Sequence, residues 1–179
     1  THLERANENL QSFAGMDFGR YVDLSALIPA QLLPDLTRKA LFVLEMRDVP
    51  FEAQKQVVYF VLDRLPRFMY SAFDKTGNGA YLSEVAVQRY GVGRVEGIDL
   101  SQSWYLEHMP RYKAAFEDAQ VLLPADADVV QDHLDIKRVR GIPKVPRSAD
   151  GKRKGARDGK WRHGDTAIAG ALLWYACQQ

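Results

Sequence analysis

Three aspartates, far apart in the chain, stand where predicted strands end or a predicted helix begins. Asp17 follows a short run of apolar residues, Asp74 ends a second apolar run, and Asp165 is the first residue of the last predicted helix. Carboxylate oxygens suit hard divalent cations such as Mg²⁺ and Mn²⁺, which keep several waters and need few protein ligands. Two such ions can activate a water molecule and neutralise the leaving oxygen of a phosphodiester. These residues therefore favour metal-dependent phosphodiester hydrolysis.

Each of these acids also has a purely structural interpretation. Asp74 could form an Asx-turn ahead of the glycines that follow it, and Asp165 could cap the helix that it opens. Asp17 lies among apolar residues, so its carboxylate would need polar partners if it were buried. His163, two residues before Asp165, could transfer a proton or contact a phosphate. The spacing alone leaves both interpretations open.

The composition limits the possible classes of protein. The chain has 179 residues, of which 46% are hydrophobic and 26% charged, as in ordinary soluble domains. No apolar run approaches the roughly 20 residues that a membrane-spanning helix needs. Cys177 is the single cysteine, which excludes a disulfide framework and a cysteine-rich zinc site. We expect one domain and no membrane partner.

The net charge of +1 conceals a strongly basic segment at 137–162. This segment has eleven Lys or Arg residues against two Asp, whereas the rest of the chain has 13 basic and 21 acidic residues. Such a local positive potential attracts phosphate backbones, although a solvated loop is the simpler alternative. The candidate phosphate contacts are Lys137, Arg138, Arg140, Lys144, Lys152, Arg153, Lys154, Arg157, Lys160 and Arg162.

The hydrophobic pattern predicts an α/β sandwich with a mixed sheet. Strands are expected in two segments within 13–28 and over 39–46, 67–73, 95–98 and 136–145. Helices are expected over 48–66, 77–90 and 103–119, from about residue 126, and over 165–176. Pro110 should kink or break the third of these helices. The stretch 148–159 is predicted to be a hairpin tip or loop.

Four stretches of the chain resemble one known family. They are GMDFGRYVDLS (15–25), FDKTGNGAYLSEVAVQRYG (73–91), SWYLEHMPRYKAAFEDAQVLLPAD (103–126) and RHGDTAIAGALLWYA (162–176). Together they resemble the C-terminal nuclease domain of the large terminase subunit of tailed bacteriophages, most closely the Mu-like type. The resemblance covers nearly the whole chain from about Phe13.

The resemblance implies an RNase H-like fold, with a central mixed sheet of about five strands flanked by helices. It also implies that Asp17, Asp74 and Asp165 are a catalytic triad binding Mg²⁺ or Mn²⁺, with two ions expected. Asp23 resembles an additional acid of the first motif. Where many relatives have a more glycine-rich turn, this chain has Arg20 and Tyr21.

The implied activity is endonucleolytic cutting of double-stranded viral DNA during genome packaging, in the cytoplasm of the infected bacterial host. The implied partners are an ATPase motor domain of the same full-length protein, the small terminase subunit and the portal. Residues 1–12, which begin without Met and are polar, are interpreted as a linker remnant from the ATPase domain, and 13–179 as the nuclease domain.

Two alternatives remain at this stage. A catalytically idle DNA-binding or docking module would work through 137–162 and would bind DNA without metal. Another RNase H-like nuclease, such as a resolvase or transposase, would share the acid chemistry and differ in substrate preference.

Overall fold

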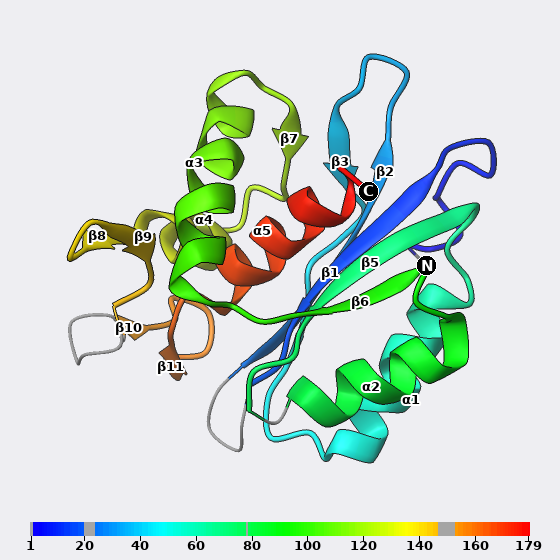
Figure 1. Cartoon of the computed structure of the whole chain (residues 1–179), viewed down its shortest axis with the longest axis horizontal. Coiled ribbons are helices and arrows are strands. Elements are labelled where there is room, and N and C mark those ends of the chain that lie inside the picture. The colour runs from blue at the N-terminus through cyan, green and yellow to red at the C-terminus, as the bar shows by residue number, and fades with distance from the viewer. Residues whose placement is uncertain (1, 20–23, 78, 147–152) are drawn as a thin grey trace.

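A seven-stranded mixed sheet forms the centre of the computed structural model, which describes residues 2–19, 24–77, 79–146 and 153–179 (Figure 1). The strand order is β6-β5-β1-β2-β3-β7. β3 pairs with residues 30–32 of β2, and β4 pairs with residues 25–27 of the same strand. β1 is antiparallel to β2 and parallel to β5, which is parallel to β6. The strands are β1 (Ser12–Asp17), β2 (Ser25–Leu32), β3 (Arg38–Ala40), β4 (Leu44–Met46), β5 (Phe68–Asp74), β6 (Val95–Ile98) and β7 (Val121–Leu122).

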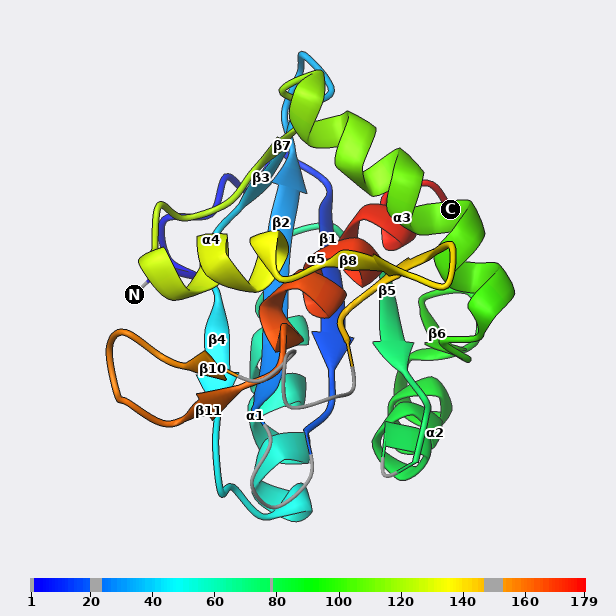
Figure 2. The same ribbon diagram turned by 90° about the vertical axis from the view of Figure 1, so that its left-hand side faces the viewer.

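Helices cover both faces of this sheet (Figures 1 and 2). α1 (Phe51–Leu62) and α2 (Gly79–Tyr90) lie on one side; α3 (Gln102–Glu117), α4 (Ala127–Leu134) and α5 (Asp165–Ala176) lie on the other. Two small hairpins complete the fold: β8 (Lys137–Val139) with β9 (Ile142–Lys144), and β10 (Arg153–Lys154) with β11 (Trp161–Arg162). The α/β class is therefore confirmed, with more strands than the five expected because the side beyond β2 consists of three short strands. None of the helices within the described ranges is long and apolar enough to span a lipid bilayer.

The alternation of side chains along β1 assigns its two faces. Met16 packs into the cluster that contains residues of α1 and α2, whereas Phe13 packs with Leu173 of α5. A Cβ atom at Gly15 would lie 2.1 Å from the carbonyl oxygen of Ala169, so only glycine lets α5 cross the strand this closely. The helix that begins with Asp165 is thereby fixed against the strand that ends with Asp17.

The prediction of one continuous strand over 39–46 is wrong. Ala30 of β2 pairs with Ala40, whereas Leu27 pairs with Leu44, so three residues, 41–43, oppose two residues of β2. One extra residue in a strand interrupts the ladder, as in a β-bulge. The segment therefore divides into β3 and β4.

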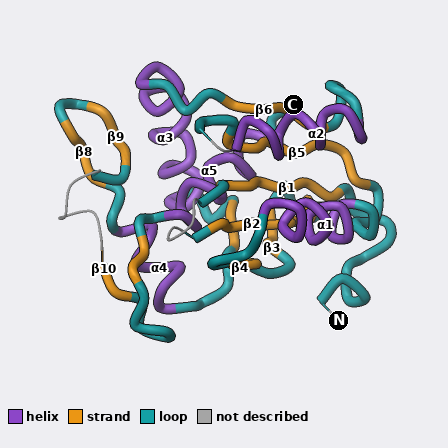
Figure 3. The backbone as a smooth tube through the Cα atoms, turned by 90° about the horizontal axis from the view of Figure 1, so that it is seen from below, coloured by secondary structure: helices purple, strands orange, loops and turns teal. Residues whose placement is uncertain are grey.

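The prediction of a single extended strand over 136–145 is also wrong. Arg140 and Gly141 have φ angles of 51° and 85°, and two successive positive φ values are typical of the tight turns that join antiparallel strands. The segment folds back as the β8–β9 hairpin, which lies at the opposite end of the molecule from α1 and α2 (Figure 3).

Pro110 does not break the helix that contains it. α3 continues from Gln102 to Glu117. Pro110 is on the exposed side, where water can satisfy the carbonyl group of the preceding turn that loses its amide partner.

Candidate active site

The side chains of Asp17, Asp74 and Asp165 line one cleft of about 410 Å³. The sheet brings the first two together, since β1 and β5 are parallel and Met16 pairs with Phe73. The residues that follow this pair are Asp17 and Asp74, at the same edge of the sheet. α5 supplies the third acid from its first residue. Three acids from distant parts of the chain therefore line the same cleft.

Asp74 is nearly buried, with 7% of its surface exposed. Its Oδ1 accepts hydrogen bonds from the Thr76 amide (2.7 Å) and the Thr76 hydroxyl, so the Asx-turn interpretation is correct as a description of the local geometry. Burial raises the pKa of Asp74 above its usual range. The Thr76 hydrogen bonds and the neighbouring Asp17 side chain lower the pKa of Asp74 and only partly oppose that shift.

Asp165 is equally buried, at 7% exposed. Its Oδ2 accepts from the His163 amide at 3.1 Å, while Gly164, with a φ of 72°, occupies the cap position of the helix. Burial raises the pKa of Asp165 to about 6, and the negative charge of Asp132 contributes to this rise. The fold thus holds a second acid in a setting that disfavours its own negative charge.

The donor set fits hard divalent cations. The partners that the described residues give Asp74 and Asp165 are hydroxyl and amide groups rather than Lys or Arg side chains. Burial favours the protonated form of these two carboxyl groups, and a divalent cation can take the place of that proton. No three acidic, histidine or cysteine side chains within the described ranges are close enough to enclose one ion. Mg²⁺ is commonly held by one or two carboxylates, waters and substrate phosphates, which suits this open arrangement.

The wall of the cleft contains polar residues that the sequence did not single out. Gln102 and Tyr105 of α3 line it together with Thr76. Asp99, the residue after β6, lies close enough for its charge to raise the pKa of Asp74. The sequence could have indicated Asp99, because this acid follows a short predicted strand just as Asp74 ends one.

His163 links the cleft to the β8–β9 hairpin. Its Nε2 lies 2.7 Å from the carbonyl oxygen of Pro146, so this nitrogen carries the proton and donates it. His163, Lys144 and Val145 all line the cleft. His163 is therefore in the cleft, and its proton-transfer or phosphate-contact role stays a prediction.

Comparison with known proteins gives the fold a family context. No family model matches the chain. It is 39% identical over 168 residues to "Mu-like prophage FluMu protein gp28" of Haemophilus influenzae, an alignment covering 94% of this chain and 32% of that protein. It is 40% identical over 157 residues to "Probable terminase, large subunit gp28" of Escherichia phage Mu, covering 87% of this chain and 28% of that protein. The chain spans about a third of the length of these relatives.

A solved structure matches almost the whole fold. The large terminase nuclease of thermophilic phage G20c with bound magnesium superposes with a TM-score of 0.69 at 18% identity, covering 95% of this chain and 83% of that one. The chain has the fold of a large-terminase nuclease domain. The resemblance to Mu-like large terminase subunits and the expectation of an RNase H-like fold are both confirmed. Structures of the G20c nuclease with bound zinc and cobalt also match.

The basic segment of this terminase-nuclease fold divides into two parts. On the β8–β9 hairpin, Lys137, Arg138 and Arg140 are exposed, and Lys144 is half-buried at the cleft. Among the described residues, no acidic side chain forms an ion pair with any of these four. Lys154, on β10, is exposed and lies over the Trp161 ring.

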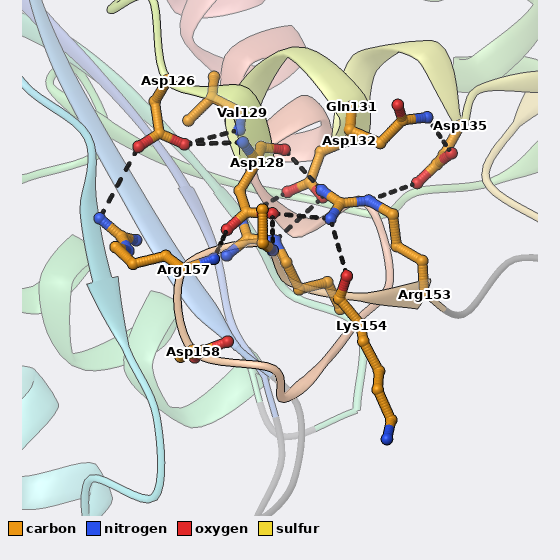
Figure 4. Close-up of polar contacts among 12 residues, drawn as sticks. Asp126, Asp128, Val129, Gln131, Asp132, Asp135, Arg153, Lys154, Arg157 and Asp158 are labelled. Carbon is orange, nitrogen blue, oxygen red and sulfur yellow. Dashed lines mark hydrogen bonds and ion pairs between the residues drawn. The ribbon is translucent and has the colours of Figure 1, made fainter.

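The remaining described cations face acids of the same molecule. Arg162 is 2% exposed and bonds to Asp132 and Glu45, so its guanidinium group has a structural role in place of the predicted phosphate contact. Arg153 is likewise bound by Asp128 and Asp132 of α4 and by Asp135, the residue that caps its C-terminal end (Figure 4). Arg157 pairs with Glu45 and Asp126, and Lys160 lies 3.9 Å from Asp48; both remain exposed. Asp23 and Lys152 lie outside the described residues.

Proposed function

We propose that the chain is a divalent-metal-dependent endonuclease that cuts double-stranded viral DNA during genome packaging. The observation that carries this proposal is the meeting of Asp17, Asp74 and Asp165 in one cleft, two of them buried where their negative charge is disfavoured. A buried acid with a raised pKa in a cleft marks a candidate functional site. The chain shares its fold with large terminase nucleases, one of which was solved with bound magnesium, and this likeness also supports the proposal.

The three acids divide into a pair and a single residue. Asp17 and Asp74, at the ends of the neighbouring strands β1 and β5, would hold one Mg²⁺ or Mn²⁺ ion, and Asp165 would complete a site for a second. Such a pair of ions supplies an activated water and neutralises the leaving 3′ oxygen. The Thr76 amide keeps the Asp74 carboxylate directed into the cleft, and the His163 amide does the same for Asp165.

DNA would reach the cleft along the β8–β9 hairpin. Lys137, Arg138 and Arg140 would contact phosphates outside the cleft, and Lys144 would contact a phosphate at its wall. Contacts of this kind position the duplex without reading its sequence, and they make binding strongly salt-dependent. We therefore expect little base specificity.

The gp28 relatives support a wider setting for this domain. We propose that residues 1–12 connect this domain to an ATPase motor of the same full-length protein. The small terminase subunit and the portal would be its further partners, in the cytoplasm of the infected bacterium. The name of the phage Mu relative, a probable terminase large subunit, supports this setting.

The test is conversion of supercoiled plasmid to open and linear forms by the purified chain. We expect cutting with Mn²⁺ or Mg²⁺, none with EDTA, and none with Asp74→Asn, which keeps the shape of the side chain but removes its charge. Asp35→Asn, an exposed acid in a loop, serves as the matched control and should cut normally. Chain that shifts DNA on a gel equally with and without EDTA but never cuts would instead support an idle DNA-binding module.

A further inference from the structure

The carboxylate of Asp132, on α4, is completely buried, at 0% exposed. Its Oδ1 accepts from Arg153 Nη2 at 2.6 Å and Arg162 Nε at 3.2 Å. Its Oδ2 accepts from Arg162 Nη2 at 2.8 Å, the Thr166 hydroxyl at 2.7 Å and the Thr166 amide at 3.3 Å. One side chain therefore binds three residues from the last third of the chain.

Two of these partners stand on either side of Asp165 in the sequence. Arg162 precedes it by three residues, and Thr166 follows it directly. The short turn between them, which includes Gly164 at positive φ, is thus held at both ends by the same carboxylate. Asp165 has little freedom to move relative to α4 while these bonds are intact.

The bonds of Asp132 to Arg162 and Thr166 form a clamp around Asp165, and this clamp is also connected to the central sheet. Arg162 Nη2 bonds to Glu45 Oε1 of β4 at 2.6 Å, in addition to Asp132. Figure 2 shows β4 beside the β10–β11 hairpin, of which Arg162 is the last residue. One network of ion pairs and hydrogen bonds therefore fixes the segment that carries Asp165 to both α4 and the sheet.

Asp128, one turn earlier on α4, provides a contrast within the same network. It is almost as buried as Asp132 and pairs with Arg153, but its other bonds go to the amides of Ala156 and Arg157 (Figure 4). These contacts shape the loop of the β10–β11 hairpin. Among the described residues, the Asp128 side chain bonds to Arg153, Ala156 and Arg157 rather than to Arg162 or Thr166, so it does not hold the segment carrying Asp165.

We infer that Asp132 is a positioning residue, which holds the Asp165 carboxylate in the orientation needed to bind a divalent cation. This inference rests on the proposed function and deepens it by naming a residue outside the cleft on which the metal site depends. Residues that orient a metal ligand commonly change metal affinity by about 10–100-fold when they are replaced.

The experiment measures Mn²⁺ binding to the whole chain at pH 8, without DNA, by the loss of the free Mn²⁺ signal in electron paramagnetic resonance. We expect Asp132→Asn to raise the Kd for Mn²⁺ at least about tenfold. Asp128→Asn removes an equally buried charge from the same helix and should leave the Kd within about twofold of wild type. An equal rise in both variants would overturn the inference, because charge or stability alone would then explain the effect.

Substitutions at Thr166 test the same clamp without changing any charge. Thr166→Val preserves the shape of the side chain and removes the hydroxyl bond to Asp132, so it should raise the Mn²⁺ Kd by a smaller factor. Thr166→Ser keeps the hydroxyl and should restore wild-type affinity. These variants decide the question if Asp132→Asn does not fold, and wild-type affinity in Thr166→Val would then overturn the inference.

The two proposals fail in different ways. Wild-type chain that binds Mn²⁺ and cuts plasmid, with Asp132→Asn and Thr166→Val indistinguishable from it, would overturn the positioning role alone. Wild-type chain that neither binds Mn²⁺ nor cuts DNA would overturn the proposed function, and the positioning role with it.

Discussion

The cleft and the inner face of α4 both bury aspartates, but in opposite electrostatic surroundings. Burial raises the pKa of Asp165 to about 6, with only the His163 amide bond and weaker effects opposing it. Burial would also raise the pKa of Asp128, but hydrogen bonds from the Ala156 amide and the Arg153 guanidinium outweigh it and lower that pKa to about 2. Arg153 and Arg162 pair with the acids of α4, whereas no Lys or Arg side chain within the described ranges bonds to Asp74 or Asp165.

The difference separates structural acids from candidate ligands. A buried ion pair with saturated hydrogen bonds holds elements together, as Asp132 does for α4, the β10–β11 hairpin and α5. An acid buried where its charge is disfavoured lowers the stability of the folded chain. Acids of this kind are common at functional sites, where a ligand supplies the missing favourable interaction. The same residue type therefore lies in two different electrostatic settings in neighbouring parts of this molecule.

The largest effect on stability is expected from the α4 network. Asp132→Asn leaves the buried Arg162 with Glu45 as its remaining acidic partner. Breaking a buried ion pair is strongly destabilising, so we expect the free energy of unfolding to fall by about 3 kcal/mol. Urea denaturation in EDTA measures this loss. A change no larger than that of the surface control Asp35→Asn would contradict the structural role assigned to the network.

The pH dependence of stability should report the same network. The pKa of Asp128 falls from an ordinary 3.8 to about 2 in the folded chain. Its contribution is therefore present above pH 4 and is lost as the pH falls toward 2, and it amounts to about 2 kcal/mol. The difference in unfolding free energy between wild type and Asp128→Asn should shrink over that range. A difference that stays constant from pH 6 to pH 3 would show that the Asp128 charge is not what stabilises the fold.

Basic residues without an acidic partner among the described residues are expected to bind DNA more strongly than those held in the α4 network. Replacing Lys137, Arg138 and Arg140 together with Gln should weaken DNA binding at least tenfold at 0.15 M salt, about 1.4 kcal/mol. The slope of log K against log salt should fall by up to about 2.7, because each phosphate contact contributes roughly 0.9. The matched control replaces the exposed Arg5, Arg64 and Arg94 with Gln. Equal losses in both triple variants would mean that net charge, rather than the hairpin, attracts DNA.

The smallest expected effect has the opposite sign. Asp74→Asn removes a charge that burial disfavours and keeps the shape of the side chain. In EDTA this variant should unfold at a slightly higher urea concentration than wild type. Destabilisation of the size expected for Asp132→Asn would place Asp74 among the structural acids instead.

Local sequence was sufficient to predict the elements that carry the cleft. Apolar runs that end in Asp17 and Asp74, and the helix opened by Asp165, are set by patterns within a few residues, and the structure reproduces them. The resemblance to large-terminase nuclease domains added the expectation that the three acids meet. What these patterns do not contain is the pairing of distant charges.

The acid network shows why the rest could not be predicted. Glu45 and Arg162 are 117 residues apart in the chain, and their contact depends on where β4 and the β10–β11 hairpin come to lie. A basic segment read by composition alone therefore appeared uniformly available for DNA. One partial signal existed: Asp128, Asp132 and Asp135 follow helical spacing, which places three acids on one side of α4.

Thermal unfolding with and without Mn²⁺ tests the contrast between the two sets of acids most directly. A ligand that binds the folded chain raises its Tm. We predict the same Mn²⁺-induced rise in wild type and in Asp128→Asn, although the latter starts from a lower Tm, and no rise in Asp74→Asn. A rise in Asp74→Asn equal to that of wild type would contradict the assignment of the cleft acids as the metal site.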